Sequence, residues 1–102
     1  MTYTLKILSA ADVESADTIT WLLEHTSPEH VAAYVAAISS GLDEIVASPF
    51  AWARWKSLRD VRVHHLREIS YSIIYQVRGR VVLVVAFAHM SRAPGYWLDR
   101  LT

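Results

Sequence analysis

The sequence predicts a single α+β domain of element order β-α-α-β-β-β, in which an antiparallel meander of strands packs against an N-terminal helical hairpin. Three observations predict this fold. Apolar residues between positions 11 and 48 recur at a helical spacing, whereas residues 61–89 form three strand-like runs joined by short turns. Neither a repeat nor a Gly/Ser linker interrupts the 102 residues, so we expect one domain over 1–102.

A short strand and a first helix are expected at the start of the chain. Residues 3–9 alternate in polarity, as strands do. From 11 to 25 the apolar spacing becomes helical, and acids crowd the first turns, where they favour the positive end of the helix dipole. The expected buried face of this helix consists of Val13, Ala16, Thr20 and Leu23.

A second helix is expected over residues 28–48. Ser27 is a natural N-cap, and Pro28 suits the first helical position. Because about two residues separate the two helices, they should lie antiparallel as a hairpin. The expected buried stripe of the second helix consists of Val31, Tyr34 or Val35, Ile38, Leu42 and Ile45.

Three strand-like runs follow, over residues 61–67, 70–77 and 80–89. Gly79 supplies the positive φ that a tight hairpin turn needs. The last run is apolar at almost every position, so both its faces should be covered and it should lie centrally in the sheet. A final helical turn is expected after Pro94.

Charge is distributed unevenly, although the net charge is zero. Residues 1–50 contain one base and seven acids, whereas residues 51–102 contain nine bases, eight of them arginine, and three acids. Arginine presents a planar fork of donors that suits phosphate and carboxylate groups. The sequence therefore suggests a cationic working face supported by an acidic scaffold.

Composition also excludes several classes of protein. The chain has no cysteine, which excludes disulfides and thiolate zinc sites. The N-terminus lacks the basic start and long apolar stretch of a secretory signal. The longest apolar run, 81–88, is far shorter than the ~20 residues of a membrane-spanning helix. We expect a soluble cytoplasmic protein with no membrane partner.

The segment after the last strand is the first candidate site. His89, Arg92 and Tyr96 leave the end of a rigid scaffold, where loops commonly hold functional side chains. One interpretation places these three residues around an anionic target. The other makes Tyr96 and Trp97 anchors that fix the chain end, with Arg100 in solvent.

A second candidate is a clamp for a phosphodiester or an acidic peptide, formed by Arg54, Lys56, Arg62 and Arg92. If Val61, Val63 and His65 pack against the helices, then Arg62 and His64 point to the open face, because side chains alternate along a strand. The alternative is a solvated arginine face. The aromatic connector, residues 50–60, is interpreted as a lid over one core edge rather than a base-stacking platform.

Other catalytic and metal-binding patterns are weak. His64 and His65 are adjacent on a strand and face opposite ways, and no HxH or HExxH pattern is present, so neither a metal site nor a cofactor is expected. The acids lie in the helices at spacings typical of exposed faces. The three glycines form no phosphate-cradling loop.

Taken in order and at this length, the elements resemble the RelE/ParE superfamily of toxins. The resemblance covers nearly the whole chain. Its sharpest parts are Arg62 and Arg67 entering the meander, Tyr71-Ser-Ile-Ile-Tyr75, the Arg78-Gly79 turn and His89-x-x-Arg92. It implies the growth-arresting toxin of a type II toxin–antitoxin pair, bound in a hetero-oligomer and neutralised by a cognate antitoxin.

Two activities occur in this superfamily. RelE-like members are ribosome-dependent mRNA endonucleases, and the resemblance then assigns catalytic roles to Arg54, Lys56, Arg62, His89, Arg92 and Tyr96. ParE-like members instead inhibit DNA gyrase by binding, without a catalytic set. Because a neutral chain gains little general attraction to RNA, and no glutamate base is evident on the cationic face, the ParE-like activity is favoured. A non-toxic interaction domain is a minor alternative.

Both activities imply the same partner site. We expect an apolar groove beside the helical hairpin or the sheet edge to receive an antitoxin peptide, whose acidic residues would meet the arginines. The four Trp and five Tyr suit such a groove.

Overall fold

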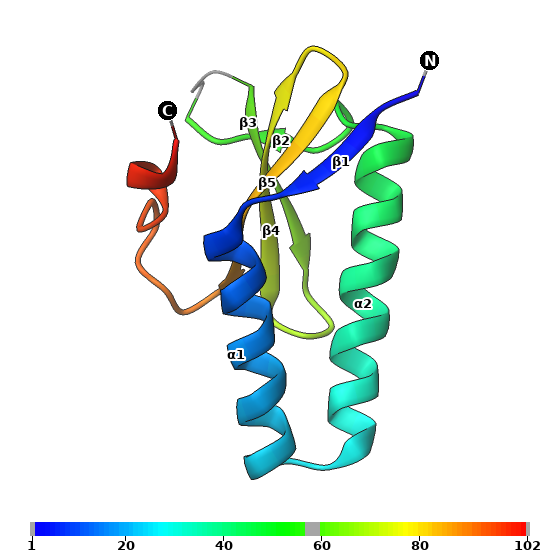
Figure 1. Cartoon of the computed structure of the whole chain (residues 1–102), viewed down its shortest axis with the longest axis vertical. Helices are drawn as coiled ribbons and strands as arrows, with labels where there is room; N and C mark the ends of the chain where they lie inside the picture. The colour runs from blue at the N-terminus through cyan, green and yellow to red at the C-terminus, as the bar shows by residue number, and fades with distance from the viewer. Residues whose placement is uncertain (1, 57–59, 102) are drawn as a thin grey trace.

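The computed structural model describes residues 2–56 and 60–101 and forms a five-stranded mixed sheet with two helices. The strand order is β1-β5-β4-β3-β2, in which β1 is parallel to β5 and the other neighbours are antiparallel. The elements are β1 (Thr4–Ile7), α1 (Ser9–His25), α2 (Pro28–Ala47), β2 (Ala53–Arg54), β3 (Val61–Leu66), β4 (Tyr71–Arg78), β5 (Val81–His89) and the 3₁₀ turn η1 (Leu98–Arg100). Figure 1 shows α1 and α2 as an antiparallel hairpin.

The architecture confirms the predicted α+β fold, with two additions. The short strand β2 extends the sheet from within the connector, and β1 pairs in parallel with β5, so the sheet is mixed. Part of the predicted connector, residues 57–59, lies outside the described residues. The turn glycine Gly79 has a φ of +58°, as the hairpin prediction requires.

The second helix forms as the sequence predicts. The Ser27 Oγ accepts a hydrogen bond from the His30 N–H at 3.4 Å, and Pro28 occupies the first turn. Tyr34, rather than Val35, completes the buried stripe, and its hydroxyl lies 3.2 Å from the Ser15 Oγ of α1. The burial of Tyr34 raises the pKa of its phenol.

The predicted buried face of the first helix is wrong. Val13 and Leu23 are 58% and 62% exposed, and Ala16 and Thr20 are also exposed. The face that packs consists of Ala11, Glu14, Ser15, Thr18, Ile19 and Leu22. Apolar residues occur around most of this helix, so a 3.6-residue period fits either of two faces as the buried one.

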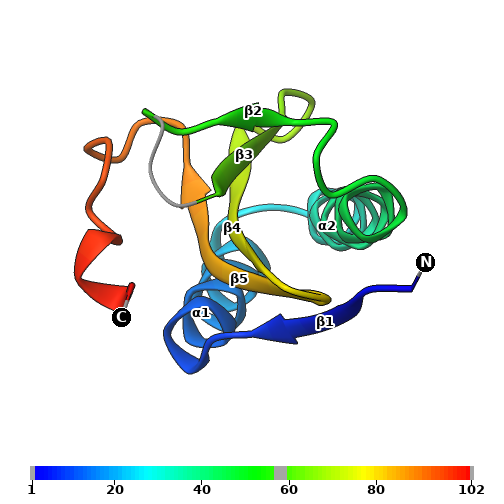
Figure 2. The ribbon, with the colours of Figure 1, turned by 90° about the horizontal axis from the view of Figure 1, so that it is seen from above.

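The two faces of the sheet carry separate apolar clusters. On the helix face, β5 and β4 bury Val82, Val84, Ile73 and Tyr75 against α1 and α2. On the tail face, Val61, Ile74, Val85, Ala86 and Ala88 lie under Trp97 of the C-terminal segment. Figure 2 shows α2 and the C-terminal segment on opposite sides of the sheet. Both faces of β5 are therefore covered, and β5 is an interior strand, as predicted.

The facing of β3 is the reverse of the prediction. Val61 and Val63 lie on the tail face, whereas Leu66 lies on the helix face beside Gly41 of α2. His64 also points to α2, where its Nε2 is 3.1 Å from the Glu44 Oε1. Both faces of this strand carry apolar residues, so alternation alone does not decide between them; Leu66 packs in the larger cluster.

Candidate functional site

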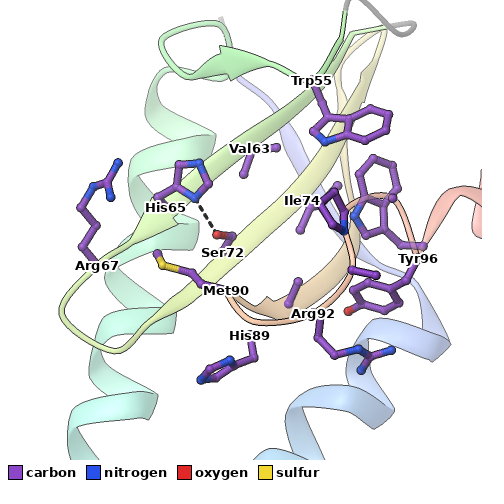
Figure 3. Close-up of a pocket in the computed structure, with 15 residues that line it drawn as sticks. Trp55, Val63, His65, Arg67, Ser72, Ile74, His89, Met90, Arg92 and Tyr96 are labelled. Atoms are coloured by element: carbon purple, nitrogen blue, oxygen red, sulfur yellow. Dashed lines mark hydrogen bonds between the residues drawn. The ribbon is translucent and has the colours of Figure 1, made fainter.

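A groove of about 390 Å³ lies on the tail face, between the ends of β3–β5 and the C-terminal segment (Figure 3). Its described lining contains arginine and histidine side chains and no carboxylate. The lining residues are Trp55, Val63, His65, Arg67, Ser72, Ile74, Ala88, His89, Met90, Arg92, Ala93, Pro94, Gly95, Tyr96 and Trp97. We call this the tail groove.

Aromatic side chains close one end of the tail groove. The Trp55 and Trp97 rings meet edge to face with centroids 4.9 Å apart, and Trp97 is only 2% exposed. The Lys56 Nζ lies 4.8 Å from the centre of a Trp55 ring. Together with Trp52, which packs on the helix face, Trp55 confirms the prediction that the connector covers the core edge.

The C-terminal segment is fixed by a carboxylate on α1. The Tyr96 hydroxyl donates to Glu14 Oε2, and the Arg100 Nη1 donates to Glu14 Oε1 at 2.7 Å. Glu14 also accepts the Phe87 N–H at 3.2 Å, so it joins α1, β5 and the tail. Burial, followed by the bond to Glu14, raises the pKa of Tyr96 well above its ordinary value, which keeps the hydroxyl protonated.

This arrangement confirms that Tyr96 and Trp97 anchor the chain end, but it places Arg100 in an ion pair rather than in solvent. It also corrects the interpretation of the helical acids as exposed, because the Glu14 side chain is only 16% exposed. Sequence reasoning missed Glu14, since its partners lie 73 to 86 positions away. No local pattern in the sequence distinguishes Glu14 from the exposed acids of the same helix.

Two histidines in the tail groove are hydrogen-bonded to serines. The His65 Nδ1 lies 2.7 Å from the Ser72 Oγ, and the His89 Nδ1 lies 2.7 Å from the Ser91 Oγ. Partial burial, with the nearby charges of Arg67 and His64, lowers the pKa of His65. His65 is therefore a neutral imidazole at neutral pH.

The proposed four-residue cationic clamp does not assemble. Arg62 lies on the helix face, where its Nη1 donates to the Trp52 carbonyl at 2.8 Å and to the Phe50 carbonyl at 3.3 Å. Arg54 is its register partner on β2 and is exposed. Arg92 is on the tail face, with its guanidinium 3.9 Å above the Tyr96 ring. The prediction of one shared cluster is wrong because β3 turns the opposite face to the helices.

The structure does bring the three residues of the first candidate site together. His89, Arg92 and Tyr96 line the tail groove, and Lys56 lies beside its Trp55 wall. Chemically, the groove offers an apolar floor with cationic and imidazole groups at its rim. Among residues 2–56 and 60–101, no three His, Asp or Glu side chains could hold a metal ion. Within the same ranges, no helix is long and apolar enough to cross a membrane.

A second set of exposed apolar side chains lies on the two helices. Val13, Trp21 and Leu23 of α1 are each more than half exposed, and Val35 of α2 is 46% exposed. Val13, Ala16, Thr20 and Leu23 lie on one exposed face of α1, and we call these four residues the hairpin stripe. Large exposed apolar side chains of this kind are typical of protein–protein contact surfaces.

Comparisons with known proteins agree on a fold and a family. The family described as the ParE toxin of type II toxin–antitoxin systems, parDE, matches residues 5–94. No curated protein matches the sequence.

Solved structures similar to this chain include two bacterial toxins. A chromosomal ParDE toxin–antitoxin system from P. aeruginosa matches with a TM-score of 0.75 and 15% identity, over 88% of this chain and 98% of that chain. A mutant of the E. coli toxin RelE in the free state matches with a TM-score of 0.72 and 20% identity, over 100% of both chains. The same mutant bound to a peptide of the antitoxin RelBc matches with a TM-score of 0.64 and 19% identity, over 100% of this chain and 97% of that chain. At these identities the likeness shows the fold.

Proposed function

The chain belongs to the family of ParE toxins of type II toxin–antitoxin systems, and from this premise we propose that it arrests growth by binding and inhibiting DNA gyrase. A binding inhibitor needs a complementary surface and no catalytic groups of its own. The tail groove and its cationic rim offer such a surface. This target would place the working protein in the cytoplasm.

The observation that best supports inhibition over RNA cleavage is the position of the candidate catalytic residues. A nuclease needs its general base, its cations and its leaving-group donor around one phosphate. Here Arg62 is on the helix face and bonded to backbone carbonyls, and the Tyr96 hydroxyl is committed to Glu14. The candidate catalytic residues of a RelE-like nuclease are therefore divided between the two faces of the sheet.

Purified protein and a gyrase supercoiling assay test this proposal directly. We expect wild-type protein to inhibit supercoiling of relaxed plasmid in proportion to its concentration. The matched measurement is the mapping of mRNA 5′ ends after induction, where we expect no new ends at ribosomal A-sites. Unimpaired supercoiling together with new A-site ends would contradict the proposal.

A RelE-like nuclease is the second candidate, and one observation favours it. His65 is bonded to Ser72 and shares the tail groove with Arg92, so a neutral imidazole lies in the same groove as a cation. In that mechanism the catalytic residues would be Arg54, Lys56, Arg62, His89, Arg92 and Tyr96. Substitution of Arg62 and Tyr96 should then abolish cleavage, whereas continued cleavage by both variants would exclude this assignment.

We further propose that a cognate antitoxin covers the hairpin stripe and forms a hetero-oligomer with the toxin. The stripe presents Val13, Ala16 and Leu23 beside one threonine on a regular helical surface, which suits an amphipathic segment. Co-expression with the small neighbouring gene should rescue growth. Failure of that gene product to form a complex would contradict the pairing.

A further inference from the structure

The tail groove contains two arginine side chains with no acidic partner. The guanidinium groups of Arg67 and Arg92 have no carboxylate within ion-pair distance among the described residues, whereas Arg62 and Arg100 are both paired. Figure 3 places Arg67 beside His65 and Arg92 beside Tyr96, with Val63 and Ile74 between these two pairs. Unpaired arginines at both sides of an apolar floor favour a ligand that is both anionic and apolar.

Arg92 is held ready for such a ligand. Its guanidinium carbon lies 3.9 Å from the centre of the Tyr96 ring, and this cation–π contact holds the side chain beside the groove. Tyr96 is in turn fixed by Glu14, so the groove wall is formed before a ligand arrives. A preorganised wall lowers the entropy lost on binding.

The aromatic groups argue for a peptide rather than a single-stranded nucleic acid. Bases are bound by stacking on open aromatic faces. In this groove Trp97 is buried and meets Trp55 edge to face, Lys56 covers a Trp55 ring, and two arginines lie over Tyr96. The aromatic rings therefore form walls and offer no stacking platform.

We propose that the tail groove binds an extended peptide segment of gyrase that carries a carboxylate next to apolar side chains. This inference rests on the proposed gyrase function. The carboxylate pairs with Arg92 or Arg67, and the apolar side chains lie on Val63, Ile74 and Ala88. The groove volume, about 390 Å³, falls within the ~300–1,000 Å³ of ligand sites.

Charge-reversal variants test the groove separately from the overall function. Arg67→Glu and Arg92→Glu reverse the rim, and Ala93→Asp places a carboxylate at an exposed lining position. Arg80→Glu is the matched control, because Arg80 is an exposed arginine in the β4–β5 turn and lies outside the groove. Circular dichroism and thermal unfolding are then used to check that each variant is folded.

For each of the three groove variants, we expect half-inhibition of supercoiling at a protein concentration on the order of tenfold higher than for wild type. We also expect these variants not to retain gyrase in a pull-down. Arg80→Glu should behave as wild type, and all four should still bind the antitoxin. If wild-type protein inhibits and the folded groove variants inhibit equally, the groove inference is overturned while the function stands. If wild-type protein itself does not inhibit, the proposed function fails first.

Two further outcomes would also overturn the inference. One is loss of antitoxin binding in the groove variants, which would assign the groove to the antitoxin. The other is binding of a single-stranded RNA oligonucleotide at physiological salt that Arg67→Glu and Arg92→Glu abolish. We expect no such binding.

Discussion

The carboxylate of Glu14 lies 2.7 Å from the guanidinium of Arg100, although 86 positions separate them in the sequence. Both side chains are mostly buried. Glu14→Gln removes the charge while keeping the shape, and the ion pair becomes a buried cation without its partner. We expect the free energy of unfolding to fall by about 2–4 kcal/mol in urea titrations.

Asp17→Asn, exposed in the middle of the same helix, is the control and should change stability by less than about 0.5 kcal/mol. A double-mutant cycle with Arg100→Met isolates the pair. An interaction energy near zero would show that the ion pair between Glu14 and Arg100 does not stabilise the tail.

Arg62 is expected to act on stability through the connector. Arg62→Ala leaves the Trp52 and Phe50 carbonyls without their donor, so we expect a loss of about 1–3 kcal/mol. Arg54, the register partner of Arg62 on β2, is exposed. Arg54→Ala should therefore change the free energy of unfolding very little. Thermal unfolding of the two variants compares them, and equal stability would contradict the structural role of Arg62.

Gly41 allows α2 to approach the sheet closely. A Cβ at this position would lie 2.9 Å from the Ile73 Cδ1 and 3.0 Å from the Leu66 Cδ2. We expect Gly41→Ala to destabilise the fold by about 1–3 kcal/mol, because the core must shift, although alanine favours a helix. Ser40→Ala, exposed on the same helix, serves as the control in chemical denaturation. Stabilisation by Gly41→Ala would contradict this packing.

The hairpin stripe should matter for partner binding and little for folding. Leu23→Glu replaces a side chain that is 62% exposed, so we expect stability to change by less than about 0.5 kcal/mol. Placed in an apolar interface, the same carboxylate would be desolvated, and antitoxin affinity should fall by about 100-fold in calorimetry. Arg80→Glu, in the remote β4–β5 turn, should retain full affinity. Unchanged affinity of Leu23→Glu would exclude the stripe as the antitoxin surface.

His65 should make the protein less stable in acid. Its pKa is lowered in the folded state, so over the range between that lowered pKa and the ordinary value of 6.5 the unfolded chain binds more protons. The free energy of unfolding therefore decreases as pH falls below 6.5. Urea titrations across this range should give a shallower decrease for His65→Gln, and an identical slope would contradict the lowered pKa of this imidazole.

Local signals predicted most of the fold. Ser27-Pro28 marked the start of α2, Gly79 marked the β4–β5 turn, and the unbroken apolar run of β5 indicated an interior strand. Each of these signals acts within a few residues, where backbone geometry decides the outcome.

Choices that depend on distant partners were not predictable in the same way. α1 and β3 each carry apolar residues on two sides, so only packing against the rest of the fold decided which side is buried. The role of Glu14 depends on Tyr96 and Arg100, which no local pattern connects to it. The division of the arginines between two faces followed from the single choice of face in β3.

The parallel pairing of β1 with β5 has a consequence for synthesis of the protein. Thr4 pairs with Val81, and Ile7 pairs with Val84, so the first strand has no neighbour until residues 81–84 have been translated. Contacts of such wide sequence separation form late and slowly. A nascent chain thus cannot complete its sheet, nor the tail groove that the sheet supports, before residues 81–97 have been translated.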